Sequence, residues 1–208
     1  MLINVILYAA LGSQWRIDTK DFDNYGHYVY HWEQVLYFRN LIQTFLSAFS
    51  HFNWQHTLLN MLCFFICGLY LERKLGSIKF LLLIICFAFF GGCAVAANHN
   101  SINSYGFSGV NYAIYAYILI DYLFWVIPKE RRNKLNIISG AVMLALIYFA
   151  ACFNGGTEQV SFSWYPYDAL HNLGHYTSYL VGLIIATLLC ANEYRIERKL
   201  NEYKKQLQ

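Results

Sequence analysis

A serine flanked by glycines stands at the start of a long apolar segment. In Gly106-Phe107-Ser108-Gly109 the glycines allow the backbone to approach an exposed hydroxyl closely, and apolar and aromatic residues follow as far as Ile127. Two more polar clusters lie inside other apolar segments: His51, His56 and Asn60 in one, His171 and His175 in another. Polar groups within membrane segments are costly, so they usually face the interior of a bundle and carry function. These residue types therefore indicate nucleophilic catalysis inside a membrane.

The chemistry of a serine nucleophile assigns a role to each type of residue. Serine is weakly nucleophilic until a base removes its proton, and histidine is the usual base, so Ser108 needs a histidine within hydrogen-bond reach. The tetrahedral intermediate needs donors for its oxyanion, which the side chains of His56 and Asn60 and the backbone N–H of Ser108 would supply. His56 and Asn60 are four residues apart and share one helix face. No acidic third member is evident, which favours a dyad over a triad.

Composition indicates an integral membrane protein. Of the 208 residues, 58% are hydrophobic and only 13% are charged, and there are two prolines. Six apolar segments are long enough, or nearly so, to span a bilayer, which takes about 20 helical residues. They are 1–14, 52–71, 78–97, 107–127, 136–153 and 172–192. We therefore expect an all-α membrane protein, a six-transmembrane-helix bundle forming one domain over 1–208, with an interfacial loop at 15–50.

The basic residues fix the expected orientation. Twelve of the 15 lysines and arginines lie between spans two and three, between spans four and five, or after span six. The positive-inside rule then places these loops and the tail 193–208 in the cytoplasm, with the last helix continuing into that tail. The serine, histidine and asparagine candidates all fall in the outer half of the bundle, at similar depth. Small size and short tails favour the plasma (inner) membrane of a prokaryote.

The order of these motifs resembles the rhomboid intramembrane serine proteases. The resemblance rests on His51-x4-His56-x3-Asn60, on Gly106-x-Ser108-Gly109, on His175 ahead of the small residues Ser178 and Gly182, and on Glu72-Arg73-Lys74-Leu75-Gly76-Ser77. It covers about residues 40–192. A Trp-Arg pair common in that family before the first histidine is Ile42 and Gln43 here, and the glycine expected three residues after the base is Ser178. These departures concern the anchoring of the first loop and substrate preference rather than the catalytic groups.

The resemblance implies a complete set of roles. Ser108 is the nucleophile and His175 the base; His56, Asn60 and Ser108 form the oxyanion hole; His51, Tyr112, Gly106 and Gly109 support them. It also implies a six-helix bundle with a loop embedded in the membrane between the first two spans. The expected partners are transmembrane protein substrates, cleaved near their outer ends, and membrane lipid. No cofactor, metal or nucleic acid is expected.

Other interpretations remain open on the sequence alone. His171 competes with His175 for the role of base, because His171-x-x-Gly174 has the same pattern; Gly182 and the apolar residues after it favour His175. The protein could instead be a catalytically inactive rhomboid-like protein that binds membrane clients, although such a protein would be expected to lack the serine or the base. A transporter or metal site lined by histidines is a third class, and the spacing of Cys63 and Cys67 would allow a metal pair.

Overall fold

The computed structural model describes residues 45, 48–49, 51, 54–96, 107–128, 133–155, 160–166 and 172–207. The expected first span at 1–14, most of the interfacial loop at 15–50, and the positions of Gly106 and His171 lie outside the described residues.

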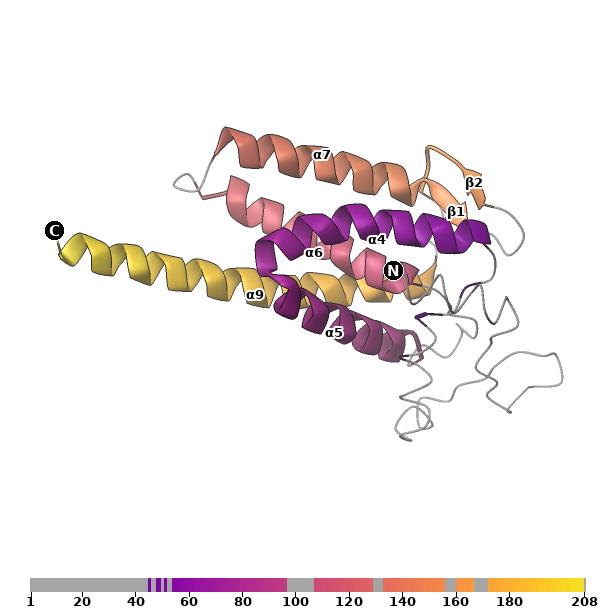
Figure 1. Cartoon of the computed structure of the whole chain (residues 1–208), viewed down its shortest axis with the longest axis horizontal. Coiled ribbons are helices and arrows are strands. Elements are labelled where there is room, and N and C mark those ends of the chain that lie inside the picture. Colours follow the sequence, from indigo (N-terminus) through magenta and orange to yellow (C-terminus); the bar gives the residue numbers. More distant parts are fainter. Residues whose placement is uncertain are drawn as a thin grey trace.

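The described chain is a bundle of helices with one short hairpin (Figure 1). In chain order the elements are α4 (Trp54–Leu75), α5 (Ser77–Ala96), α6 (Ser108–Val126), α7 (Lys134–Ala151), β1 (Phe153–Gly155), β2 (Val160–Phe162) and α9 (Leu173–Gln206). Five of the six expected spans therefore coincide with helices, with ends that differ by a few residues. The expectation that the last helix continues into the charged tail is confirmed, because α9 runs without interruption for 34 residues.

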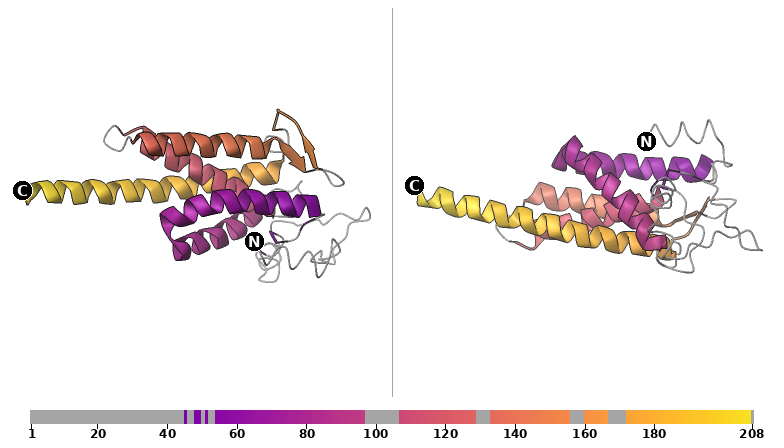
Figure 2. Two further views of the ribbon diagram at one scale, coloured as in Figure 1. Left: turned by 45° about the horizontal axis from the view of Figure 1, so that its top comes forward. Right: turned by 90° about the horizontal axis from the view of Figure 1, so that it is seen from below.

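A glycine turn reverses the chain between α4 and α5. Gly76 has φ +79°, a left-handed conformation that glycine adopts without steric cost, and its N–H donates to the Glu72 carbonyl at 2.8 Å. The Ser77 hydroxyl donates to the Glu72 carboxylate at 2.7 Å. The first bond satisfies a carbonyl that the end of α4 leaves open, and the second holds the turn from the side chains. After this turn α5 runs back along the bundle beside α4 (Figures 1 and 2).

Helix α6 is the centre of the bundle. It packs against α4, α5, α7 and α9, and its buried side chains include Val110, Ala113, Ile114, Tyr117 and Ile118. In Figure 1, α6 lies behind α4, with α7 on one side of it and α9 on the other. Since Ser108 is the first residue of this helix, the best-packed element of the structure positions the candidate nucleophile.

Small residues let α6 and α9 approach each other closely. A Cβ added to Gly182 of α9 would lie 2.4 Å from the Ala113 carbonyl oxygen of α6, so the two backbones touch at this point. One turn earlier, the buried Ser178 lies between α5 and α6: a Cβ on either Gly91 or Gly109 would lie 3.0 Å from its hydroxyl. The expectation that Ser178 is small enough for close packing against α6 agrees with this contact.

The outside of the bundle is apolar. Large hydrophobic side chains are exposed along the helices, among them Leu58, Leu62 and Phe65 on α4, Leu81 and Ile85 on α5, and Ile184 and Leu188 on α9. Within the described residues, three helices are long and apolar enough to cross a membrane: Ser108–Val126, Lys134–Ala151 and Gly174–Gln206. Ser77–Gly91 is a shorter apolar helix. Apolar surface on this scale is what a lipid-facing bundle requires.

The segment after α7, expected only as a loop, contains an antiparallel hairpin. Phe153 pairs with Phe162, and Gly155 pairs with Val160. The Tyr148 hydroxyl donates to the Trp164 carbonyl at 2.8 Å, which ties the segment after β2 to α7. Three-residue strands of mixed composition carry too short an alternation to be recognised from sequence.

The contact between Gly182 and Ala113 predicts the effect of a single methyl group. Gly182→Ala should lower the stability of the bundle by roughly 1–3 kcal/mol, because the added Cβ meets backbone that cannot move aside. Thermal unfolding in detergent measures this. The matched control is Gly68→Ala, whose Cβ would meet side-chain ring atoms of Phe80 and Phe64 rather than backbone, the nearest at 3.2 Å. Equal effects of the two variants would contradict the proposed backbone contact.

Candidate active site

Three helices begin at the same end of the bundle and bring their first turns together. α4, α6 and α9 all start near the hairpin, at the end opposite the C-terminus of α9 (Figure 1). The N-cap of α6 is Phe107, which makes no side-chain capping bond. The first N–H groups of a helix have no partners within it and carry a partial positive charge. Ser108 therefore lies where a developing negative charge is stabilised.

The hydroxyl of Ser108 contacts the imidazole of His175. Ser108 Oγ lies 2.9 Å from His175 Nε2, a hydrogen-bond distance between residues 67 positions apart in the sequence. Asn172 caps the start of α9 by accepting from the backbone N–H groups of Gly174 at 3.0 Å and His175 at 3.3 Å. The cap fixes where α9 begins. The packing of Gly182 against α6 fixes how near α9 comes, so backbone contacts set the position of His175 relative to Ser108.

The ring of Tyr112 stacks on one face of the His175 imidazole. The two rings are stacked, with centroids 4.3 Å apart and an interplanar angle of 24°. Tyr112 follows Ser108 by one helical turn, so a single face of α6 presents both the hydroxyl and the aromatic platform. A stacked aromatic ring limits rotation of the imidazole without needing a carboxylate behind it.

Asn60 is oriented by a residue that sequence reasoning missed. The side-chain amide of Asn111 donates to the Asn60 backbone carbonyl at 3.0 Å and to Asn60 Oδ1 at 3.2 Å. Both residues are buried, and Asn60 Nδ2 has no hydrogen-bond partner within the described part of the protein. Because Asn111 occupies the carbonyl side of the amide, the N–H side is left available to an incoming acceptor. A polar residue three positions after Ser108 in an apolar helix was the available signal.

His51 links the entrance of α4 to the start of α6. The backbone N–H of Phe107 donates to His51 Nε2 at 3.3 Å, and the ring of His51 is 5.3 Å from that of His56, edge to face. Burial, and secondarily the neighbouring His56, lower the pKa of His51 to about 3, against a smaller opposing effect of the Phe49 backbone. A neutral His51 is required here, because only an unprotonated Nε2 accepts a hydrogen bond.

The structure describes only some of the other residues expected at the site. Gly109 packs against Ser178, whereas Gly106 and His171 lie outside the described residues. Among the residues that the structure describes, no group of three or more His, Cys, Asp or Glu is arranged to hold a metal ion. Cys63 and Cys67 are buried free thiols in the core. The site is thus a serine and a histidine in contact, a supporting tyrosine and an oriented amide donor.

Comparison with known proteins identifies the class of this bundle. Residues 39–192 match the family model described as the rhomboid domain, which is most of the chain. The chain belongs to the rhomboid family, and the resemblance expected from its motifs is confirmed. With the family and its apolar helices established, the protein is a multi-pass membrane protein.

Several bacterial proteins are similar to this chain at low identity. The rhomboid protease GlpG of Yersinia pestis (strain Pestoides F) is 26% identical over 140 residues, covering 67% of this chain and 45% of that protein. The rhomboid protease GlpG of Salmonella paratyphi A (strain ATCC 9150 / SARB42) is 26% identical over 142 residues, covering 68% of this chain and 46% of that protein. The matched regions therefore span under half the length of these relatives.

The buried His51 predicts a pH dependence of stability. Its pKa of about 3 in the folded protein lies below the ordinary value of 6.5, so the unfolded chain binds a proton first as the pH falls. This contribution to stability is complete above pH 6.5 and is lost progressively towards pH 3. By pH 5 the loss should be on the order of 1–2 kcal/mol.

Thermal unfolding of the wild type and His51→Gln in detergent tests this, because the glutamine carbonyl keeps an acceptor for the Phe107 N–H without titrating. The wild type should lose more stability between pH 7 and pH 5 than the variant does. Parallel pH curves for the two proteins would show that His51 is not the group responsible.

Proposed function

We propose that this protein is an intramembrane serine endopeptidase that cleaves transmembrane protein substrates with a Ser108–His175 dyad. The observation that carries the proposal is the 2.9 Å contact between Ser108 Oγ and His175 Nε2 inside an apolar bundle. A hydroxyl that contacts a neutral imidazole nitrogen has a base in position to remove its proton. The membership of the chain in the rhomboid family and the names of its relatives support the same activity.

The reaction follows from the positions of these groups. His175 Nε2 takes the proton of Ser108 as Oγ attacks the scissile carbonyl carbon, giving a tetrahedral intermediate. His175 then gives the proton to the leaving amine as the peptide C–N bond breaks and an acyl-enzyme remains. Water from the outer side, activated by the same imidazole, hydrolyses the ester and regenerates Ser108. The Tyr112 ring keeps the imidazole aligned through both steps, the role that a carboxylate fills in a triad.

The oxyanion is stabilised from two helices. On α6, the backbone N–H of Ser108 and the positive end of the helix face the developing charge. On α4, Asn60 Nδ2 is buried without a partner among the described residues, and a buried donor left open is costly unless a ligand uses it. His56 supplies a further donor, and His51 supports this region through the Phe107 backbone. Gly106 and Gly109 complete the motif that surrounds the nucleophile.

The membrane arrangement follows the sequence analysis. In the arrangement we propose, six spans form a single domain over 1–208, with an interfacial loop at 15–50 and a cytoplasmic C-terminus. The proposed location is a prokaryotic inner membrane. The basic loops lie at one end of this arrangement and the Ser108 site at the other, so cleavage takes place near the outer surface. Transmembrane proteins enter from the lipid, and no cofactor is required.

Substitution of the dyad tests the activity. Ser108→Ala and His175→Ala should each lower cleavage of a model transmembrane substrate in detergent or liposomes by about 10³-fold or more, because the nucleophile and base act as one unit. His171→Ala is the matched control, since it removes a histidine one helical turn away in the sequence and should leave cleavage close to the wild-type rate.

Each other outcome contradicts a definite part of the proposal. Activity that survives in Ser108→Ala would exclude the serine mechanism. Loss of cleavage in His171→Ala but not in His175→Ala would assign the role of base to His171. A wild type that binds transmembrane clients without cleaving any of a panel of substrates would favour the inactive rhomboid-like alternative.

Asn111 should affect catalysis through Asn60. Asn111→Leu and the isosteric Asn111→Asp both remove the donor to Asn60 Oδ1, so the Asn60 amide loses its fixed orientation. We expect kcat to fall roughly tenfold or more with a smaller change in KM, because the oxyanion forms only after substrate is bound. Cleavage kinetics at several substrate concentrations measure both constants. A rise in KM with unchanged kcat would assign Asn111 to substrate binding instead.

A further inference from the structure

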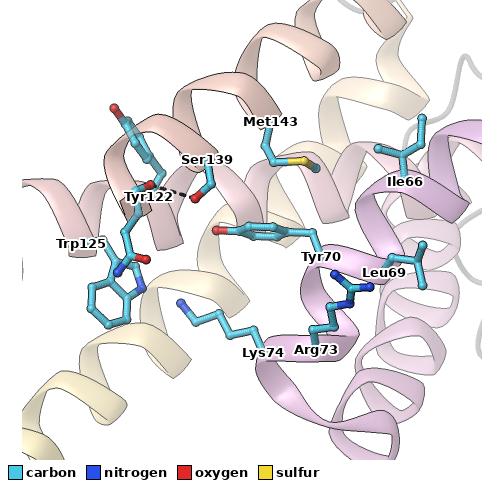
Figure 3. A pocket seen from close by; sticks show the side chains of 10 residues that line it. Ile66, Leu69, Tyr70, Arg73, Lys74, Tyr122, Trp125, Ser139 and Met143 are labelled. Atoms are coloured by element: carbon cyan, nitrogen blue, oxygen red, sulfur yellow. Dashed lines mark hydrogen bonds between the residues drawn. The ribbon is translucent and has the colours of Figure 1, made fainter. Parts of the chain in front are cut away.

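A cavity opens at the opposite end of the bundle from Ser108. It lies between the C-terminal ends of α4 and α6 and the N-terminal half of α7, and its volume is about 620 Å³ (Figure 3). None of the residues that line it belongs to the serine–histidine site. The cavity is therefore not explained by the proposed cleavage reaction.

The lining of this cavity changes from apolar to charged along α4. Ile66 and Leu69 line one part with Met143 of α7, while Arg73 and Lys74 lie one to two turns further on (Figure 3). From Ile66 to Arg73 is seven residues, or roughly 10 Å along a helix axis. A ligand that fills the cavity thus meets hydrocarbon at one end and positive charge at the other.

The two basic residues have different environments. Lys74 makes an ion pair with the buried Asp121, and its Nζ lies 5.1 Å from the centroid of the Trp125 ring. Asp121 neutralises this charge. Arg73 is exposed and has no ion-pair partner within the described part of the chain. Its guanidinium is therefore the cation in the cavity that remains available to a ligand.

The shape of a guanidinium indicates the kind of anion. Its planar fork of N–H donors matches two oxygens of a phosphate, and such charge-assisted bonds are strong where water is scarce. Ser139 adds a hydroxyl to the lining. It donates to the Asn136 carbonyl at 3.2 Å, and rotation about its C–O bond would turn the same donor to a phosphate oxygen. Phosphate recognition beside an apolar channel is the chemistry that a phospholipid requires.

We propose that this cavity binds an anionic phospholipid, with the phosphate on Arg73 and an acyl chain along Ile66, Leu69 and Met143. The basic residues place this end of the bundle at the cytoplasmic leaflet, where anionic lipids are found. Inorganic phosphate shares the headgroup chemistry but gains nothing from the apolar half of the cavity. The lipid is therefore the favoured occupant.

Native mass spectrometry of the full chain tests this proposal without reference to cleavage. The protein in detergent is supplied with phosphatidylglycerol, phosphatidylcholine or inorganic phosphate. Wild type should retain phosphatidylglycerol at least about fivefold better than phosphatidylcholine, and Arg73→Gln should remove that preference. Arg195→Gln is the matched control, an identical change on an exposed part of α9 outside the cavity, and should behave as wild type.

A second variant separates a lipid from a free anion. Leu69→Asn should lower retention of phosphatidylglycerol severalfold. Leu81→Asn, the same change on the exposed face of α5, should not lower it. Equal retention of phosphatidylglycerol in wild type and Arg73→Gln would overturn the proposal. Displacement of the lipid by inorganic phosphate, with Leu69→Asn unchanged, would also overturn it and indicate a free-anion site. Retention of a transmembrane peptide in place of either lipid, unaffected by Arg73→Gln, would assign the cavity to protein contacts.

Discussion

Polar side chains that α6 carries into the apolar bundle contact partners on neighbouring helices, because lipid offers no hydrogen bonds. At its first turn Ser108 contacts His175 of α9; one turn on, Asn111 contacts Asn60 of α4; at the far end Asp121 pairs with Lys74 of α4. These pairs lie at successive levels along one helix. Each contact joins α6 to a neighbouring helix at one level, so together they help to specify how α4 and α9 are set against α6.

Backbone contacts make those pairs possible. Gly182 against Ala113, and Ser178 between Gly91 and Gly109, bring α9 close enough to α6 for a short serine–histidine hydrogen bond. Dispersion and small side chains supply this closeness, since the hydrophobic effect gives helices little reason to associate in lipid. The geometry of the proposed dyad therefore depends on helix packing, because a change in the separation of α6 and α9 also changes the distance between Ser108 and His175.

The sequence predicted the helices and the principal site more fully than the contacts that orient it. Long apolar segments with basic residues at their ends are strong signals, and the spacing of His56 and Asn60 and the turn around Ser108 are specific. Asn111 was overlooked because one asparagine among tyrosines and alanines has no periodicity to mark it. Asp121 could not be assigned a partner from the sequence, since Lys74 is 47 residues away and only tertiary structure joins them. The β1–β2 hairpin is too short to display an alternating pattern.

The length of α9 has a mechanical consequence. The His175 imidazole at the start of α9 and the charged residues near its end lie on one uninterrupted helix, so a tilt or rotation of one end moves the other. Extra residues inserted after Glu193 would turn the far end by about 100° each while leaving His175 where it is. Conversely, a protein or membrane surface that binds the far end of α9 would constrain the orientation of His175 at its start.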